Sequence, residues 1–291
     1  MAAPLTLILF LQQKERENFA QCEEPSRSDS IRGNYENKIR FFSPPEKTYE
    51  IFASHKQEDG ELRMTYKDFL RAMTPYCFTP FFEDTDDYLK ENKIDVLTKV
   101  DADNDGTISF TEFFFFLVLL QIQPNRLKRV FKKYPEGKLS KEQASEALRT
   151  LRKGTQAGKK QQDKTKVDAR AIKATEDDFK TTNLHLVEVL FKDKEIITVK
   201  DILDMQDGFR EDLWNYRFHT LEPNESGKTS TENFLKTNLV SLRSPHVERY
   251  RRQIRKIAAA YEENDPGVSV HEFVALQYFF EKLDIIKAKC A

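Results

Sequence analysis

The sequence has 291 residues, with 47 Lys and Arg against 48 Asp and Glu, so its formal net charge is -1. This balance excludes bulk electrostatic attraction to nucleic acid, while 39% hydrophobic and 12% aromatic residues supply enough apolar mass for folded cores. Glycine, which sheet-rich folds use for turns and bulges, accounts for only 9 residues, so the composition predicts a mostly α protein. The three cysteines are far apart and odd in number, which excludes a disulfide framework.

Composition divides the chain into four regions. Residues 1–34 combine a short apolar patch with polar residues and are predicted to form a loosely ordered lead-in. Helical periodicity then runs through residues 35–152, the predicted N-terminal lobe, and returns in residues 179–289, the predicted second lobe. Residues 153–178 are rich in Lys, Gln and Thr and are predicted to form a basic, solvated linker between the lobes.

The first helix of the N-terminal lobe is predicted to start after Ser43. Pro44 suits the first turn of a helix, because the backbone N–H that proline lacks has no partner there. Tyr49 and Phe52 lie three positions apart, so the helix places both side chains on one face.

One pattern recurs along the chain: a helical stretch, a short polar segment with a Gly and a hydrophobic residue, and then the start of another helix. It occurs as GELRMTYKDF, DGTISFTEF, EGKLSKEQ, SGKTSTENF and GVSVHEF, with KEIITVKDIL as a relative without the Gly. Each such unit needs a partner to cover its apolar face. The pattern therefore predicts helix-loop-helix units in two lobes, whose short hydrophobic segments pair as two-stranded ribbons.

Residues 101–112 read DADNDGTISFTE and match the EF-hand calcium loop, D-x-D-x-D-G-x-I-x-x-x-E, at every constrained position. Calcium is a hard cation that takes about six to eight oxygen ligands, which this loop can supply. Gly106 permits the left-handed turn of the loop, and Ile108 is expected to pair through its backbone with a neighbouring unit. The predicted Ca²⁺ ligands are Asp101, Asp103, Asp105, the backbone carbonyl of Thr107, Ser109 through a water molecule, and Glu112 with both carboxylate oxygens.

The other units lack the ligands that calcium needs. Aligning Gly137 with Gly106 places Lys and Gln at the first and last ligand positions, so this loop cannot bind the ion. The loop around Gly227 lacks the terminal acid, and the loop around Gly267 is shortened. We predict that these pseudo-EF-hand units serve as structural pairing partners, and that the chain carries one calcium site.

Two further segments allow more than one interpretation. The run FFFFLVLL at 113–120 is apolar on all sides and predicts a helix buried between paired hands; the alternative is a groove that calcium exposes to a partner. The segment 245–261 combines an apolar stripe with five basic residues. A solvated face is the simpler interpretation, and peripheral contact with an acidic protein or anionic lipid is the alternative.

The chain contains no recognisable catalytic motif. His271 and Glu272 lack the second histidine of a zinc-protease helix, and there is no phosphate-binding glycine loop or nucleophile elbow. The five histidines are scattered, with no acid–base cluster. We therefore expect a protein that is not an enzyme.

Several strings resemble the mitochondrial calcium uptake (MICU) family. The specific ones are YENKIRFFSPPEK-x-YEIFAS and MTYKDFLRAMTP, followed by GTISFTEFFFFLVLL and by the regions 214–239 and 253–280. Together they cover roughly residues 35–283 and correspond to the N-lobe and mid-region of the family. The C-terminal lobe, which usually carries the family's second calcium loop, is expected to be missing. Family members usually place the functional N-lobe loop in the unit that here reads YPEGKLSKEQ, one unit later than the complete loop of this chain.

The resemblance implies a calcium-sensing regulatory subunit of the mitochondrial calcium uniporter, located in the intermembrane space at the inner-membrane periphery. It also implies binding to the channel subunits and a homodimer or a heterodimer with a paralogous EF-hand subunit. No nucleic-acid partner is expected. The alternatives are a cytosolic EF-hand sensor or adaptor with no tie to the channel, and a scaffold that is independent of calcium.

Overall fold

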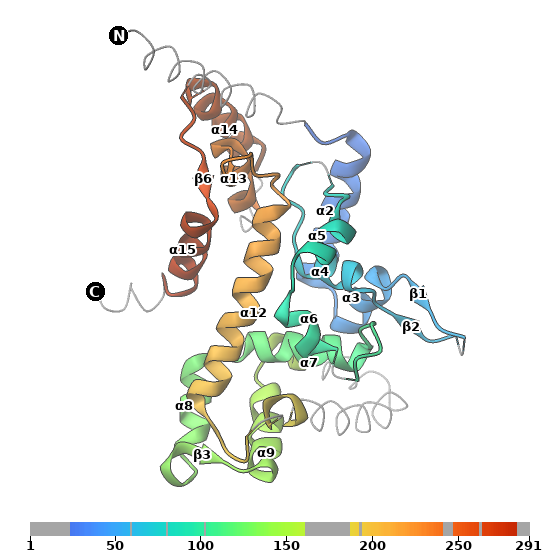
Figure 1. The fold of residues 1–291 in the computed structure, drawn as a ribbon, viewed down its shortest axis with the longest axis vertical. Helices are drawn as coiled ribbons and strands as arrows, with labels where there is room; N and C mark the ends of the chain where they lie inside the picture. The colour runs from blue at the N-terminus through green and yellow to red at the C-terminus, as the bar shows by residue number, and fades with distance from the viewer. Residues whose placement is uncertain are drawn as a thin grey trace. The chain divides into compact units, whose positions relative to one another are not determined.

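The computed structural model describes residues 24–58, 60–79, 81–101, 103–160, 187–191, 194–240, 247–261 and 264–283 (Figure 1). In this part of the chain most residues lie in helices and the strands have two residues each, so the predicted mostly helical fold is confirmed. The elements are α2 (Arg27–Phe42), α3 (Pro45–Phe52), β1 (His55–Lys56), β2 (Leu62–Arg63), α4 (Tyr66–Met73), α5 (Thr85–Glu91), α6 (Asp95–Val100), α7 (Phe110–Gln121), α8 (Pro124–Phe131), the 3-10 turn η1 (Pro135–Gly137), β3 (Lys138–Leu139), α9 (Lys141–Arg152), β4 (Ile197–Thr198), α12 (Val199–His219), β5 (Lys228–Thr229), α13 (Thr231–Leu239), α14 (Val247–Tyr261), β6 (Val268–Ser269) and α15 (Val270–Glu281).

The structure begins its first described helix earlier than the sequence indicates. The lead-in was expected to reach residue 34, but α2 starts at Arg27, where the side chain of Ser26 accepts a hydrogen bond from the N–H of Asp29. This local cap is the physical reason for the correction. The next helix, α3, follows as predicted: Pro44 is its N-cap, and both Tyr49 and Phe52 are buried.

The short strands join the helix-loop-helix units in pairs, as the recurring pattern predicts. Ile108 exchanges two backbone hydrogen bonds with Met64, at 2.8 and 3.0 Å, which confirms the expected partner role of Ile108. Antiparallel pairs also join β3 to β4 and β5 to β6. In addition, β1 and β2 form the hairpin that follows α3.

A serine or a threonine caps each described helix that leaves a paired segment: serines begin α7, α9, α13 and α15, and threonines begin α4 and α12. The side chain of Ser109 accepts from the N–H of Glu112, and the Glu112 carboxylate accepts in return from the N–H of Ser109. The same reciprocal capping box opens α9 and α15, where it needs only the local spacing Ser-x-x-Gln or Ser-x-x-Glu. These helix starts are therefore encoded in the sequence itself.

Helix α7 is buried on almost all sides. Phe113, Phe114, Phe115 and Phe116 are each exposed by 2% or less, and Val118 and Leu119 are also buried. The interpretation as a helix enclosed by its neighbours therefore holds in this structure. Burial of four consecutive phenylalanines stabilises the fold strongly, since each contributes on the order of 2 kcal/mol or more.

The described chain forms two compact units that are discontinuous in sequence. The first combines residues 1–38, 74–84 and 214–291, and the second combines residues 39–73 and 85–213. These two compact units differ from the expected lobes. Strand β4 follows the expected linker and pairs with β3, which precedes it, so the segment around β4 belongs with the helix-loop-helix units before the linker.

The beginning of the expected linker is packed and not solvated. Thr155 is 3% exposed, Ala157 is 2% exposed, and the ammonium group of Lys160 donates to the backbone carbonyls of Phe41 and Ser43. Hydrogen bonds explain this packing: the N–H of Ala157 donates to Gln121 Oε1 at 2.9 Å, and the Thr155 hydroxyl donates to the carbonyl of Arg152 at 2.8 Å. Residues 161–178 of the expected linker lie outside the described residues.

Helix α14 covers most of the basic segment. Its apolar stripe is divided: Ile254 is buried, whereas Tyr250 and Ile257 are exposed. Arg251 and Arg255 both pair with Glu24, so part of the basic face is neutralised within the protein. Among the described residues, none of the helices has the length and apolarity that crossing a bilayer requires.

Candidate metal centre

The predicted calcium loop lies between α6 and α7. Helix α6 has no side-chain cap of its own; instead, a carboxylate oxygen of Asp212, on α12, accepts from the N–H of Val96 at 2.8 Å. Among the loop residues that the structure describes, Asn104 and Gly106 have positive φ angles, of 55° and 81°. The second of these needs glycine, as the motif predicts, because other residues are strained in this conformation.

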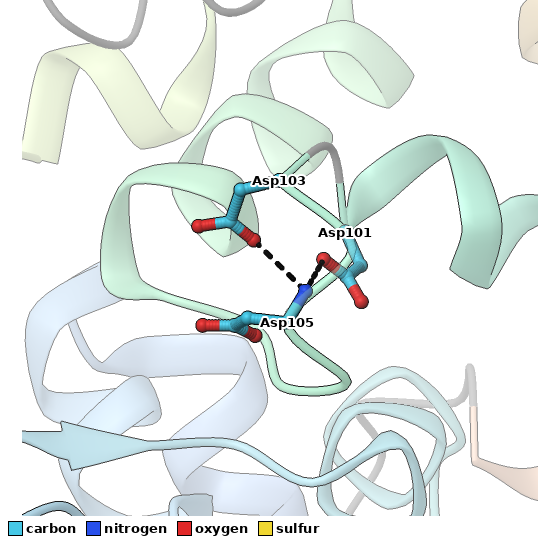
Figure 2. A group of neighbouring side chains, drawn as sticks. All are labelled: Asp101, Asp103 and Asp105. Carbon is cyan, nitrogen blue, oxygen red and sulfur yellow. Dashed lines mark hydrogen bonds between the residues drawn. The ribbon is translucent and has the colours of Figure 1, made fainter.

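Three aspartates gather inside the loop. One carboxylate oxygen from each of Asp101, Asp103 and Asp105 lies within 4.8 Å of those of the other two (Figure 2). Figure 2 also shows the N–H of Asp105 donating to both Asp101, at 3.2 Å, and Asp103, at 3.3 Å. A carboxylate oxygen of Asp101 accepts from the N–H of Gly106 at 3.0 Å. The loop backbone thus holds the three acidic groups around one point.

Glu112 does not join this group. It lies in the first turn of α7, 3% exposed, and its Oε2 accepts from both the N–H and the hydroxyl of Ser109 at 2.8 Å. The N–H of Thr107 donates to Asp105 Oδ1 at 2.7 Å. The structure therefore brings together three of the four predicted carboxylates, while the fourth caps the helix.

Two residues from the preceding unit also contact the loop. The hydroxyl of Tyr66, at the start of α4, donates to Asp101 Oδ2 at 2.6 Å. A guanidinium nitrogen of Arg63, on β2, lies 3.6 Å from Asp105 Oδ2. Neither residue was among the predicted site residues, because the loop motif describes only consecutive positions. The signal available was the pairing of Met64 with Ile108, which brings β2 beside the loop.

Burial shapes the electrostatics of the loop. It raises the pKa of Asp103 above 3.8, and a hydrogen bond to Asp101 and the nearby negative charges act in the same direction. Burial likewise raises the pKa of Tyr66, with the hydrogen bond to Asp101 as the next cause. The phenol therefore keeps its proton and remains a donor at neutral pH. The three carboxylates are crowded enough to favour a cation among them.

In two of the pseudo-EF-hand loops, side-chain oxygens accept hydrogen bonds from backbone N–H groups. In the loop around Gly227, the Asn224 side-chain oxygen accepts from the N–H groups of Ser226 and Lys228 at 3.1 and 3.0 Å. In the loop around Gly267, Asp265 accepts from the N–H groups of Gly267 and Thr231. Among the described residues, the aspartates of 101–105 are the one acidic cluster with metal-binding spacing.

The donor set fits a hard divalent cation. It consists of carboxylate oxygens, with no sulfur or imidazole, and this chemistry favours Ca²⁺ or Mg²⁺ over transition metals. The backbone closes around the three aspartates with Gly106 in the left-handed conformation that the calcium loop requires. A loop that wraps a cation this way suits Ca²⁺ better than Mg²⁺, which holds its own waters in near-ideal octahedral geometry.

Comparison with known proteins gives several relatives named mitochondrial calcium uptake proteins. The chain is 36% identical to the Calcium uptake protein, mitochondrial, of Arabidopsis thaliana over 110 residues, which cover 34% of this chain and 22% of the relative. It is 25% identical to the human Calcium uptake protein 1, mitochondrial, over 65% of this chain and 43% of that protein. For the Caenorhabditis elegans homologue the identity is 22%, over 86% of this chain and 50% of the relative. No family model matches the chain.

A solved structure supports the fold. The crystal structure of EFHA2 in the apo state has a TM-score of 0.51 with this chain, at 19% identity, over 84% of this chain and 76% of that one. The chain spans half or less of the length of the relatives described above. The resemblance to the mitochondrial calcium uptake (MICU) family is confirmed: this chain is a homologue of the calcium uptake proteins, at modest identity over much of its length.

Proposed function

We propose that this protein senses calcium through the loop at residues 101–112 and regulates the mitochondrial calcium uniporter. The observation that carries the proposal is the gathering of Asp101, Asp103 and Asp105 within one loop that matches the calcium pattern at every constrained position. Relatives named mitochondrial calcium uptake proteins support the channel and the mitochondrion as its setting. The intermembrane-space location and a dimer with itself or a paralogous subunit belong to the same proposal.

The residues that would hold calcium are the six that the motif names. Calcium, when bound, supplies a divalent charge that offsets the repulsion among the carboxylates. Asp101, Asp103 and Asp105 already lie together, whereas Glu112 must give up its two hydrogen bonds with Ser109 to reach them. The remaining ligands would be the carbonyl of Thr107 and Ser109 through a water molecule. Because Glu112 belongs to the first turn of α7, this change acts directly on that helix.

Helix α12 is placed to receive that change. Its Gln206 donates to the carbonyls of Leu119 and Ile122, at 2.6 and 3.0 Å, at the end of α7. Its Phe209 packs against Phe116, with ring centroids 5.3 Å apart. The same helix caps α6 through Asp212. Through these contacts, a shift of α6 or α7 would be transmitted to α12.

Calorimetric titration with calcium tests the site. We expect one binding event with a Kd in the sensor range, about 10⁻⁷ to 10⁻⁵ M, and its loss in Glu112→Lys. Glu272→Lys is a matched control, because Glu272 occupies the same capping position on α15 in a unit without the aspartates. Equal heats from wild type and Glu112→Lys would refute the calcium site.

Isolation from mitochondria tests the channel assignment. The tagged protein, expressed in cells, should be imported and should co-purify with the uniporter channel in a calcium-dependent amount. Glu112→Lys should co-purify in an amount that calcium does not change. Retention of the protein in the cytosol, without the channel, would favour the cytosolic sensor over the channel regulator.

A further inference from the structure

A cation from the neighbouring unit touches the calcium loop. Arg63 lies on β2, next to Met64, which is hydrogen-bonded to Ile108 of the loop. Its terminal nitrogen Nη1 is 3.6 Å from Asp105 Oδ2, and its terminal nitrogen Nη2 is 3.4 Å from Glu61 Oε2. The loop pattern does not include Arg63, and an arginine at a calcium site is electrostatically unfavourable once the ion is bound. Its presence needs an explanation.

The side chain of Arg63 is enclosed and not extended into solvent. It is only 16% exposed, and its Nε is buried with no hydrogen-bond acceptor among the described residues. A buried donor without an acceptor costs free energy, so other contacts must hold the side chain in place. The two carboxylates on either side of the guanidinium, Glu61 and Asp105, are those contacts.

Asp105 is engaged at both oxygens. Its Oδ1 accepts from the N–H and the hydroxyl of Thr107, each at 2.7 Å, while its Oδ2 faces Arg63. An incoming cation can therefore gain a carboxylate oxygen of Asp105 only in competition with a donor that is already there. The Thr107 contacts are internal to the loop, whereas Arg63 carries a full positive charge.

We propose that Arg63 is a built-in counter-ion of the calcium loop, which neutralises part of the charge of Asp105 in the ion-free protein and competes with calcium for that carboxylate. It would thereby stabilise the ion-free loop and set a weaker calcium affinity than the loop residues alone would give. This inference rests on the proposed calcium site. It assigns to the preceding unit, which lacks a calcium loop of its own, a role in setting the calcium threshold.

Calcium titration of Arg63→Gln tests the competition. Removing a positive charge several ångströms from a divalent ion should lower the Kd for calcium by roughly three- to tenfold. Arg63→Lys keeps the charge and should remain close to wild type. Lys67→Gln makes the same charge change on α4, where Lys67 pairs with Asp86, and should leave the Kd unchanged. A Kd for Arg63→Gln equal to that of wild type would overturn the proposal.

A double-mutant cycle in chelator tests the counter-ion without calcium. Arg63→Gln and Asp105→Asn should each change the melting temperature, and the double variant should differ from the sum of the single changes. Additive changes would refute the pairing. If wild type binds calcium and Arg63→Gln binds equally well, only this inference fails; if neither binds calcium, the proposed function fails and the competition fails with it.

Discussion

At the scale of single residues, Tyr66 shows how a group outside the loop can orient a predicted metal ligand. Its hydroxyl donates at 2.6 Å to Asp101 Oδ2, and its raised pKa keeps the proton in place. Hydrogen bonds of this kind hold a coordinating carboxylate in the orientation that the ion needs. If the loop binds calcium as proposed, we expect Tyr66 to affect calcium affinity through Asp101.

We predict that Tyr66→Phe weakens calcium binding by about tenfold, because Asp101 loses the donor that orients it. Calorimetric titration measures the change. Tyr35→Phe, at an exposed position on α2, is the control and should bind calcium like wild type. An unchanged Kd in Tyr66→Phe would show that the backbone alone orients Asp101.

The raised pKa of Asp103 gives the ion-free protein a distinct pH dependence. Because burial raises the folded-state pKa above 3.8, protonated Asp103 stabilises the fold. That contribution is fully present below pH 3.8 and is lost as the pH rises through the raised pKa. Wild type in chelator should therefore lose stability relative to Asp103→Asn as the pH rises from acid to neutral.

Melting temperatures in chelator, measured from acid to neutral pH, test this sign. Asp103→Asn should melt higher than wild type at neutral pH, and the difference should vanish in acid. Asp87→Asn is a control of opposite sign, since the hydrogen bond from Lys90 lowers the pKa of Asp87. A pH-independent difference between Asp103→Asn and wild type would contradict the prediction.

At the scale of elements, α7 is fixed at both ends by different means. The capping box of Ser109 and Glu112 begins it, and Gln206 from α12 satisfies carbonyls at its end. The capping box is local in sequence, whereas Gln206 lies 87 and 84 positions from the two residues whose carbonyls it contacts. A change in the hydrogen bonds of Glu112 would therefore act on the start of α7, while the bonds from Gln206 hold the end of α7 to α12.

We predict that Gln206→Leu lowers the free energy of unfolding by about 1–3 kcal/mol, because the buried carbonyl of Ile122 loses the Gln206 amide and that of Leu119 keeps only the N–H of Ile122. Urea unfolding measures this loss. Gln253→Leu, at an exposed position on α14, should remain within about 0.5 kcal/mol of wild type. Equal stability of the two variants would mean that water or a neighbouring group replaces the Gln206 amide.

At the scale of the whole molecule, the calcium loop belongs to one of two compact units. It lies in the unit formed by residues 39–73 and 85–213, and the other unit contains the β5–β6 pair. A ligand stabilises only the folded structure that binds it, by about 2.7 kcal/mol at a free concentration one hundred times the Kd. The gain should therefore be confined to the unit with the loop.

Hydrogen exchange with and without calcium tests that confinement. Amides of α6, α7 and α9 should gain protection, whereas those of α13 and α15 should not. Glu112→Lys should abolish the gain and Glu272→Lys should retain it. A uniform gain across both units would show instead that the protein unfolds as one cooperative unit.

The sequence alone was sufficient for several features that depend on neighbouring residues, although not for the start of α2, whose Ser26 cap is also local. The left-handed Gly106 turn of the loop and the helix that begins after Pro44 are each specified within a dozen positions, and their local geometry is as expected. The pairing of Ile108 was also predictable, since the loop pattern fixes which residue faces a partner. The ligand roles within the loop remain predictions.

Only the tertiary structure decided what surrounds the loop. Arg63, Tyr66 and Asp212 contact it or its helices from distant positions, and no spacing rule connects residues that far apart. The two units likewise depend on β4 joining β3 across the expected linker. The physical reason is the same in each case: motifs record the short-range geometry of consecutive residues, whereas charge and packing around a site depend on which distant segments fold against it.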